Sequence, residues 1–453
     1  MRSIPHPIHL GGEKCVTGSC HFLQANGLNL LVDCGIAQGN DPQPPISSWP
    51  VKPGQIHYCF ITHAHIDHIG RLPELIEKGF RGEILCTHAT KALLVPMLMD
   101  AMGFSSRTEK ERAALSNTIE ELSWGFETNT VFDLKKGISF KLGNAGHILG
   151  SCFIQLRSKN PGWRILFSGD LGATDTPILP DPDPPDACDL VILESTYGDR
   201  LHEGRRKRIQ SLGDILTQAL SDKGKVFIPA FSLGRTQELI YELDRLFSDK
   251  GLQAQFPELN TGPRIPVFID SPLGLEITRI YESLSAYWDA EAKSIKKSGD
   301  HPISFDSLYA VKDHHDHLKL QDIPGPQIII AGSGMCTGGR ILDHLKKGLG
   351  NAKNDIVFVG YQGRGTLGRQ LIESRGVKAA RVAIDGESVP IRARITSLSG
   401  YSAHADQYGL LHWIGQMPEK PGQIKLVHGE RPAMEALSKK FREEGYAVQP
   451  IEA

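Results

Sequence analysis

The chain has 453 residues, which is more than one ordinary hydrophobic core contains, so we expect two domains. Hydrophobic residues make up 40% and charged residues 23% of it, the profile of a soluble globular protein. The first residues lack a secretory core, and no apolar run approaches the roughly 20 residues that span a bilayer, so no membrane partner is expected. A formal net charge of −2 neither supports nor excludes nucleic acid, because a metal-centred site can attract phosphate locally.

The eight cysteines are scattered along the chain and form no CxxC pair. Several lie inside apolar, strand-like runs such as LLVDCG and IHYCFIT, where free buried cysteines are common. This pattern predicts a reducing, cytoplasmic location and no disulfide framework.

The first third of the chain reads as strands and turns with few long helices. The spacing of apolar residues predicts one helix over residues 67–78, and a loop rich in proline and aspartate covers 177–185. Short apolar, β-rich runs predict strands at 28–33, 56–62, 165–167 and 190–193.

From about residue 205 strand-like and helix-like segments alternate, which predicts a parallel sheet covered by helices. The β-rich texture returns near residue 391, and the chain ends with a strand at 424–429 and a helix at 432–445. The simplest organisation is one domain interrupted by another. We therefore expect a first part at 1–205, an inserted domain at 206–392 and a closing part at 393–453.

The most informative stretch is HAHIDH, which places His63, His65, Asp67 and His68 directly after a predicted strand. Alternate residues of an extended segment share a face, and a following helix turns the next residues toward a neighbouring position. One loop can therefore supply ligands to two metals, and imidazole with carboxylate suits zinc without excluding manganese or iron. A histidine-rich surface loop without metal is the alternative.

Three further residues favour the metal interpretation over the surface loop. Each ends or borders a strand-like run, as a site ringed by strand ends requires. They are His147 in GHILGS, Asp170 in FSGD and His428 in LVHGE.

In order along the chain, HAHIDH, GHILGS, FSGD, ESTYG, SAHAD and LVHGE resemble the successive motifs of the metallo-β-lactamase superfamily. More narrowly, they resemble those of its β-CASP ribonucleases, and the resemblance spans nearly the whole chain. It implies an α/β fold: an αββα sandwich with an inserted α/β (β-CASP) domain that contains a mainly parallel sheet.

The resemblance also implies two zinc ions and their ligands. One zinc would be held by His63, His65, His147 and Asp170. The other would be held by Asp67, His68, His428 and the same Asp170, which bridges the two. The seven ligand positions show no departure from the family pattern.

Two matched residues would not bind metal: Glu194 in ESTYG and His404 in SAHAD. Phosphodiester hydrolysis needs a proton for the departing sugar oxygen, which a histidine held by a carboxylate can supply. Without the metal cluster and the family pattern, we would interpret Glu194 as a carboxylate that caps the turn after a strand and His404 as a partly buried histidine of a turn. Asp33 and Asp199 are weaker candidates for hydrogen bonds to metal-bound histidines.

The segment 314–317 (HHDH) imitates a ligand cluster, but the family pattern does not place it at the metal, and we interpret it as solvated. The glycine-rich run that includes Gly332, Ser333 and Gly334 lacks dinucleotide-site spacing. It is interpreted as a backbone cradle for phosphate, with a tight turn as the alternative. Arginines that follow strand ends could contact the RNA backbone or be ordinary surface charges: Arg235, Arg340 and Arg364.

The resemblance therefore implies a zinc-dependent ribonuclease that cleaves single-stranded RNA with a hydroxide held by two metals. The expected catalytic residues are Asp67, His404 and Glu194, the expected product carries a 5′-phosphate, and a homodimer is a candidate assembly. His428 favours RNA, because DNA-repair members of the family have an aliphatic residue there. The alternatives are a thioester or lactone hydrolase, a DNA nuclease and a non-catalytic RNA-binding subunit.

Overall fold

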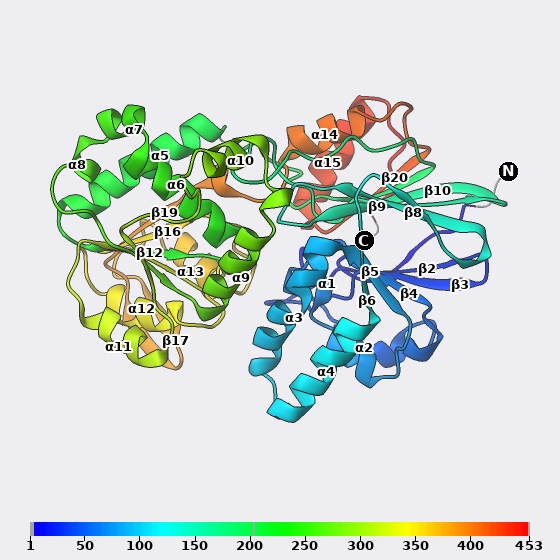
Figure 1. The fold of residues 1–453 in the computed structure, drawn as a ribbon, viewed down its shortest axis with the longest axis horizontal. Coiled ribbons are helices and arrows are strands. Elements are labelled where there is room, and N and C mark those ends of the chain that lie inside the picture. Colours follow the sequence, from blue (N-terminus) through cyan, green and yellow to red (C-terminus); the bar gives the residue numbers. More distant parts are fainter. Residues whose placement is uncertain (1–3, 203, 452–453) are drawn as a thin grey trace. The chain divides into compact units, whose positions relative to one another are not determined.

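The structure, a computed structural model, describes residues 4–202 and 204–451 (Figure 1). The chain forms two compact units, one from residues 1–201 and 404–453 and the other from 202–403. The sequence-based boundaries after 205 and 392 stay a prediction. In the structure the chain passes between the compact units after residues 201 and 403. In the described residues no helix is both long and apolar enough to cross a membrane. All eight cysteines are free and buried.

The first unit contains two six-stranded sheets. The first sheet has antiparallel contacts from β1 to β3 and parallel contacts from β3 to β6. Its strands, in spatial order, are β1 (Ile8–Gly11), β2 (Cys20–Ala25), β3 (Leu28–Val32), β4 (Tyr58–Phe60), β5 (Glu83–Thr87) and β6 (Ser123–Phe126).

In the second sheet the three strands at one edge, β10, β11 and β20, are parallel, and the others are antiparallel. The last strand of the chain therefore completes a sheet begun by much earlier ones. In spatial order the strands are β20 (Gln423–Val427), β11 (Leu190–Glu194), β10 (Gly162–Phe167), β9 (Cys152–Lys159), β8 (Ile138–Asn144) and β7 (Val131–Asp133).

The two sheets of this unit pack face to face, and helices cover their outer faces. Leu30 and Phe60 of one sheet and Phe140 and Ile165 of the other share one buried apolar cluster. A second cluster joins the outer face of the second sheet to α14 and α15. The helices are α1 (Ile66–Ile69), α2 (Leu72–Glu77), α3 (His88–Gly103), α4 (Glu109–Leu122), α14 (Gln407–Gly415) and α15 (Arg431–Glu443). These layers form the predicted αββα sandwich.

Two helix predictions for this unit are wrong. The helix expected over 67–78 is divided into α1 and α2. Pro73 has no N–H to donate to the carbonyl of Ile69, and it lies in the first turn of α2, where proline is tolerated, so a new helix begins there. The expectation of few long helices missed α3 and α4. The sequence of α3 is mostly apolar and contains Pro96, so it lacks the polar stripe that marks a surface helix.

The second unit contains a six-stranded sheet in which every pairing is parallel. This confirms the parallel sheet expected for the inserted domain. In spatial order its strands are β14 (Leu308–Ala310), β13 (Val267–Asp270), β15 (Gln327–Ala331), β12 (Lys225–Pro229), β16 (Asp355–Phe358) and β19 (Arg394–Ser397). A separate hairpin pairs β17 (Arg381–Ile384) with β18 (Glu387–Pro390).

Helices lie on both faces of this parallel sheet (Figure 1). The parallel connections require them, because each strand must return to the same edge of the sheet before the next one begins. One buried cluster joins Ile341, Leu345 and Leu371 to strand residues such as Ile329 and Phe358. The helices are α5 (Arg205–Ser221), α6 (Arg235–Ser248), α7 (Lys250–Gln255), α8 (Pro257–Asn260), α9 (Pro272–Ser283), α10 (Ala290–Lys297), α11 (His314–Asp322), α12 (Ile341–Gly348) and α13 (Leu367–Glu373).

Candidate metal centre

The segment that leaves β4 and forms α1 carries four of the predicted ligands. A hydrogen-bonded contact fixes its start: the carboxylate of Asp33, just after β3, accepts hydrogen bonds from the backbone N–H (2.8 Å) and hydroxyl (3.0 Å) of Thr62. The four side chains therefore leave the first sheet from a defined position. They are His63, His65, Asp67 and His68.

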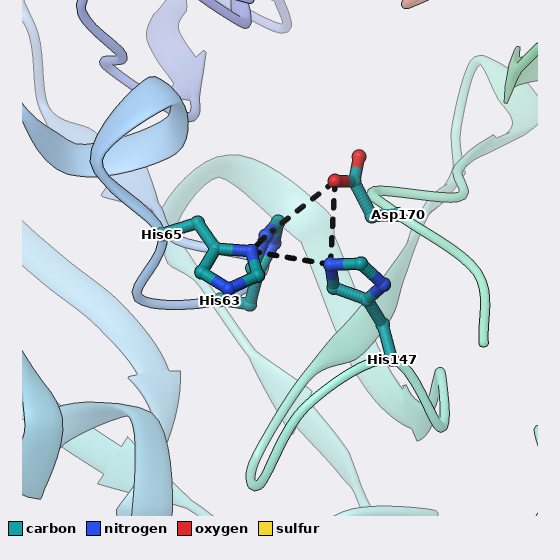
Figure 2. A group of neighbouring side chains, drawn as sticks. All are labelled: His63, His65, His147 and Asp170. Atoms are coloured by element: carbon teal, nitrogen blue, oxygen red, sulfur yellow. Dashed lines mark hydrogen bonds and ion pairs between the residues drawn. The ribbon is translucent and has the colours of Figure 1, made fainter. Parts of the chain in front are cut away.

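His63, His65, His147 and Asp170 form the first ligand group (Figure 2). His65 Nδ1 lies 3.1 Å from His63 Nε2 and 3.2 Å from His147 Nε2. Asp170 Oδ2 lies 3.6 Å from each of these Nε2 atoms. Zinc bonds of about 2.0–2.1 Å place tetrahedral ligand atoms ~3.3–3.4 Å apart. The four donor atoms thus have the spacing that a tetrahedral zinc ion requires.

Asp67, His68 and His428 form the second ligand group. His68 Nε2 lies 3.3 Å from His428 Nε2 and 3.3 Å from Asp170 Oδ1. Asp67 Oδ2 lies 3.5 Å from His428 Nε2 and 3.8 Å from His68 Nε2. His428 Nε2 faces His68 and Asp67, whereas its Nδ1 lies 3.1 Å from the hydroxyl of Thr196 and 3.6 Å from Asp170 Oδ1.

Asp170 stands between the two groups and faces each with a different oxygen. Its Oδ2 lies among the first three histidines, and its Oδ1 lies near His68 and His428. Oδ1 is buried and accepts no hydrogen bond from the described residues. A buried carboxylate oxygen without a donor costs free energy. A cation in each group would remove that cost, so the residues fit a two-metal site with Asp170 as the bridge.

The electrostatic environment also favours cations at this site. Burial lowers the pKa of His63, which keeps a lone pair available to a metal. Burial disfavours the charged form of His68, but the carboxylates of Asp170, Asp33 and Asp67 outweigh it and raise the pKa of His68. The negative potential that attracts a proton to this ring attracts a metal cation equally.

One of the two carboxylates expected behind the ligands is in place. Asp33 Oδ2 lies 2.7 Å from His68 Nδ1, so the ring turns its Nε2 toward the second group. Asp199, the other candidate, binds the guanidinium of Arg200 instead (2.8 Å).

His404 and Glu194 form a pair beside the metal ligands. Glu194 is fully buried, accepts a hydrogen bond from the backbone N–H of Leu171 (2.7 Å), and lies 3.0 Å from His404 Nδ1. His404 Nε2 lies 3.8 Å from Asp170 Oδ2, on the side of the ligand groups. Burial disfavours the cation, but the charges of Glu194 and Asp170 raise the pKa of His404 to about 9. The pair thus holds a protonated imidazole next to the centre.

The glycine-rich loop at 332–339 lies between β15 and α12 in the second unit. Some of its backbone N–H groups donate hydrogen bonds within the loop itself: Ser333 N donates to Gly338 O (3.1 Å) and Thr337 N donates to Ser333 Oγ (2.8 Å). A Cβ at Gly334 would lie 2.7 Å from the ring of Phe231, so close packing requires a glycine there. Both interpretations, a tight turn and a phosphate cradle, are compatible with this geometry.

Arg235 and Arg340 make internal contacts with carboxylates. Arg235 is 4% exposed and pairs with Glu238 one turn along α6. Arg340 Nη1 donates to Asp270 Oδ1 (2.7 Å). A contact with RNA would require either guanidinium to leave its carboxylate. Arg364 is exposed.

The prediction that segment 314–317 is solvated is wrong for one residue. His314 and His315 are exposed, but His317 is fully buried. His317 Nδ1 and His344 Nε2 each lie 2.6 Å from Asp270 Oδ2, and we call these three residues the Asp270 cluster. The sequence could have indicated that His317 is buried, since it shares a helix face with the apolar residue Leu320. Nothing in the sequence joined it to Asp270 or His344.

Three families match successive parts of the chain. Residues 14–230 match the metallo-β-lactamase superfamily and residues 236–371 match the β-CASP domain. Residues 388–451 match the domain described as a Zn-dependent metallo-hydrolase RNA specificity domain. The predicted fold class is thereby confirmed.

Several curated proteins are similar over almost the entire chain. A ribonuclease of Thermus thermophilus is 36% identical, and the match covers 99% of this chain and 97% of that protein. The transcription termination factor FttA of Methanocaldococcus jannaschii is 28% identical, with 98% of this chain and 70% of that protein covered. The cleavage and polyadenylation specificity factor 73 of Drosophila melanogaster is 29% identical, with 94% and 60% covered.

A solved structure has the same fold at low sequence identity. It is a protein of unknown function from Enterococcus faecalis with a TM-score of 0.55 and 12% identity. The match covers 99% of this chain and 98% of that one, so the shared fold extends through both units.

Proposed function

The chain belongs to the β-CASP ribonucleases of the metallo-β-lactamase superfamily, and we propose that it hydrolyses single-stranded RNA with two zinc ions. The observation that carries the two-zinc part is the position of Asp170, whose two oxygens face two separate ligand groups. When bound, the zinc ions would polarise a phosphate and activate a water molecule for attack. His63, His65 and His147 would hold one zinc, and Asp67, His68 and His428 the other.

The remaining roles fall to the chain's own side chains. Asp67 is partly exposed at 17%, so we assign to it the contact with the attacking water. His404 would donate the proton that the departing 3′ oxygen needs, so that the upstream fragment ends in a 3′-hydroxyl and the downstream fragment begins with a 5′-phosphate. Glu194 would hold the His404 ring, because its carboxylate accepts a hydrogen bond from Nδ1–H and directs Nε2 toward the ligand groups.

RNA as the substrate is supported by the match of residues 388–451 to an RNA specificity domain and by the ribonuclease among the relatives. His428, which lies within that match, contributes to the second ligand group. We propose that the loop at 332–339 and Arg364 contact phosphate groups of the strand. The expected homodimer and cytoplasmic location stay predictions.

The test compares substrates at measured metal content. The zinc-loaded chain should cleave labelled single-stranded RNA much faster than DNA of the same sequence, and it should not hydrolyse a thioester. The RNA products should be degraded by an exonuclease that requires a 5′-phosphate. Equal rates on RNA and DNA would contradict the RNA assignment, and activity that survives removal of all metal would contradict the zinc assignment.

A further inference from the structure

A cavity of the second unit lies outside the regions discussed so far. Its volume is about 360 Å³, and it is lined by residues of α6, α7 and α8 and of the segments that precede β13 and β14. In a parallel sheet the amino ends of the strands lie at the edge opposite to the carboxyl ends. The cavity borders the amino ends of β13 and β14, whereas the loop at 332–339 follows the carboxyl end of β15. The two therefore lie at opposite ends of the strands.

A buried carboxylate without a partner points into this cavity. Asp244 on α6 lines it, is only 8% exposed, and makes no hydrogen bond or ion pair with any residue that the structure describes. Burial and the negative charge of Asp300 raise the pKa of Asp244 to about 7. Arg264, which also lines the cavity, pairs with exposed Asp306 at 2.5 Å. Asp244 therefore offers an unpaired carboxylate to a positive group inside the cavity.

Two amide side chains of the cavity offer acceptors, beside the hydroxyl groups of Ser248 and Ser307 and the guanidinium of Arg264. The amide nitrogens of Asn260 and Gln253 donate to backbone carbonyl groups, so these side chains are left with their oxygen atoms as acceptors. Two aromatic rings also line the cavity: Phe247 and Phe305 meet edge to face, with centroids 5.8 Å apart. Carboxylate, amide oxygens and aromatic faces together form an environment for a positive group with many N–H donors.

We propose that this cavity binds the guanidinium or alkylammonium group of an organic cation, with Asp244 as its counter-ion. A calcium or magnesium ion would need about six or more oxygen ligands, which the phenylalanine side chains cannot supply. An anion would meet the charges of Asp244 and Asp300. The cation has two sources with the same chemistry: a free small molecule, or a lysine or arginine side chain of another protein.

Calorimetry and thermal melting of the full chain test this proposal with three probes. Agmatine carries both cationic groups, the peptide N-acetyl-Gly-Arg-Gly-amide presents an arginine side chain, and urea is a neutral analogue of guanidinium. Agmatine or the peptide should bind and raise the melting temperature, whereas urea at the same millimolar concentration should not. Binding of agmatine alone identifies a small-molecule site, and binding of the peptide alone identifies a site for a partner's side chain.

Three variants separate the site from general charge effects. Asp244→Asn should weaken binding about 10- to 100-fold, the loss expected for a hydrogen bond to a charged group, without lowering the melting temperature of the free protein. Phe305→Leu should weaken it about two- to fivefold through the lost cation–π contact, which keeps the test valid even if Asp244→Asn does not fold. Glu276→Gln, an exposed carboxylate on α9, should change nothing. No binding of either cation, or equal binding by Asp244→Asn, overturns the proposal.

Discussion

The metal centre of the first unit and the Asp270 cluster of the second contain the same residue types at different spacings. In the metal centre the neighbouring donor atoms lie 3.1–3.8 Å apart. In the Asp270 cluster both imidazoles lie 2.6 Å from the same carboxylate oxygen. The longer spacing leaves room for an ion between the ligands, whereas 2.6 Å is the length of a direct hydrogen bond.

The carboxylates at the two sites also differ in what already contacts them. The carboxylate of Asp270 makes hydrogen-bond contacts with His317, His344 and the guanidinium of Arg340, so its charge is compensated within the fold. Asp170 keeps one buried oxygen without a hydrogen-bond donor among the described residues. Residue types therefore do not identify a metal site by themselves. The candidate metal centre differs from the Asp270 cluster in its donor spacing and in the unsatisfied oxygen of Asp170.

The largest expected effect is that of Asp170→Ala. It removes the ligand that both groups share, so zinc content should fall below two per chain. Each metal contributes several kcal/mol to stabilising the transition state, which corresponds to a loss of RNA cleavage of roughly 10⁴-fold or more. Metal analysis and single-turnover rates measure both quantities.

Asp270→Ala is the matched control in the other cluster. It should leave the zinc content at two per chain, but it should lower the free energy of unfolding by about 3–5 kcal/mol because Arg340 and two histidines lose their buried partner. Denaturant unfolding measures this loss. Loss of zinc from Asp270→Ala, or full activity of Asp170→Ala, would reverse the assignment of the two sites.

His404→Ala should have the next largest effect on the reaction. The variant should keep its zinc and its affinity for RNA, but the chemical step should slow by about 10²–10⁴-fold, the range for a lost general acid. Pre-steady-state rates with parallel zinc analysis distinguish this result from that of a ligand variant.

A substrate whose leaving oxygen is replaced by sulfur sharpens the His404 test. A thiolate departs without a proton, so His404→Ala should cleave this substrate almost as fast as the unmodified enzyme does. Asp170→Ala should gain nothing from the sulfur, because its defect lies in activating the attacking water. If His404→Ala remains equally slow with sulfur, His404 positions the substrate or a ligand and is not the acid.

A smaller effect is expected from Asp33→Asn. The amide keeps the shape of the side chain but loses the charge that orients His68 through its Nδ1. Zinc affinity of the second group should fall by about 10- to 100-fold, as for other carboxylates behind metal-bound histidines. Competition with a chelator measures the affinity, and Asp199→Asn, which removes a carboxylate bound to Arg200, should leave it unchanged.

The sequence predicted the ligand segment well, because four of the seven ligands lie within six residues after a strand. The ends of strand-like runs added His147, Asp170 and His428, and the family resemblance added His404 and the division of the ligands between two metals. The separate roles of the two Asp170 oxygens were not predictable, because they depend on ångström-scale placement. The Asp270 cluster was missed for a related reason: its members lie on β13, α11 and α12, and no local pattern indicates that these elements meet.

The smallest expected effect is that of His317→Asn, and it tests the spacing argument most directly. An asparagine amide can place its nitrogen near the position of His317 Nδ1 and can donate to Asp270, but it cannot replace an imidazole as a zinc ligand. If the cluster is held by hydrogen bonds, His317→Asn should cost at most about 1 kcal/mol of unfolding free energy. His317→Ala should cost more, since it also leaves a cavity in the buried site. Both variants should retain two zinc ions per chain and normal RNA cleavage, because the Asp270 cluster has no part in the proposed reaction.

Zinc titration at micromolar excess tests for the contrary outcome. A third ion that binds the unmodified chain and is lost from both variants would make the Asp270 cluster a metal site. In that case a 2.6 Å contact could not be used to exclude a metal, and the comparison of the two clusters would fail.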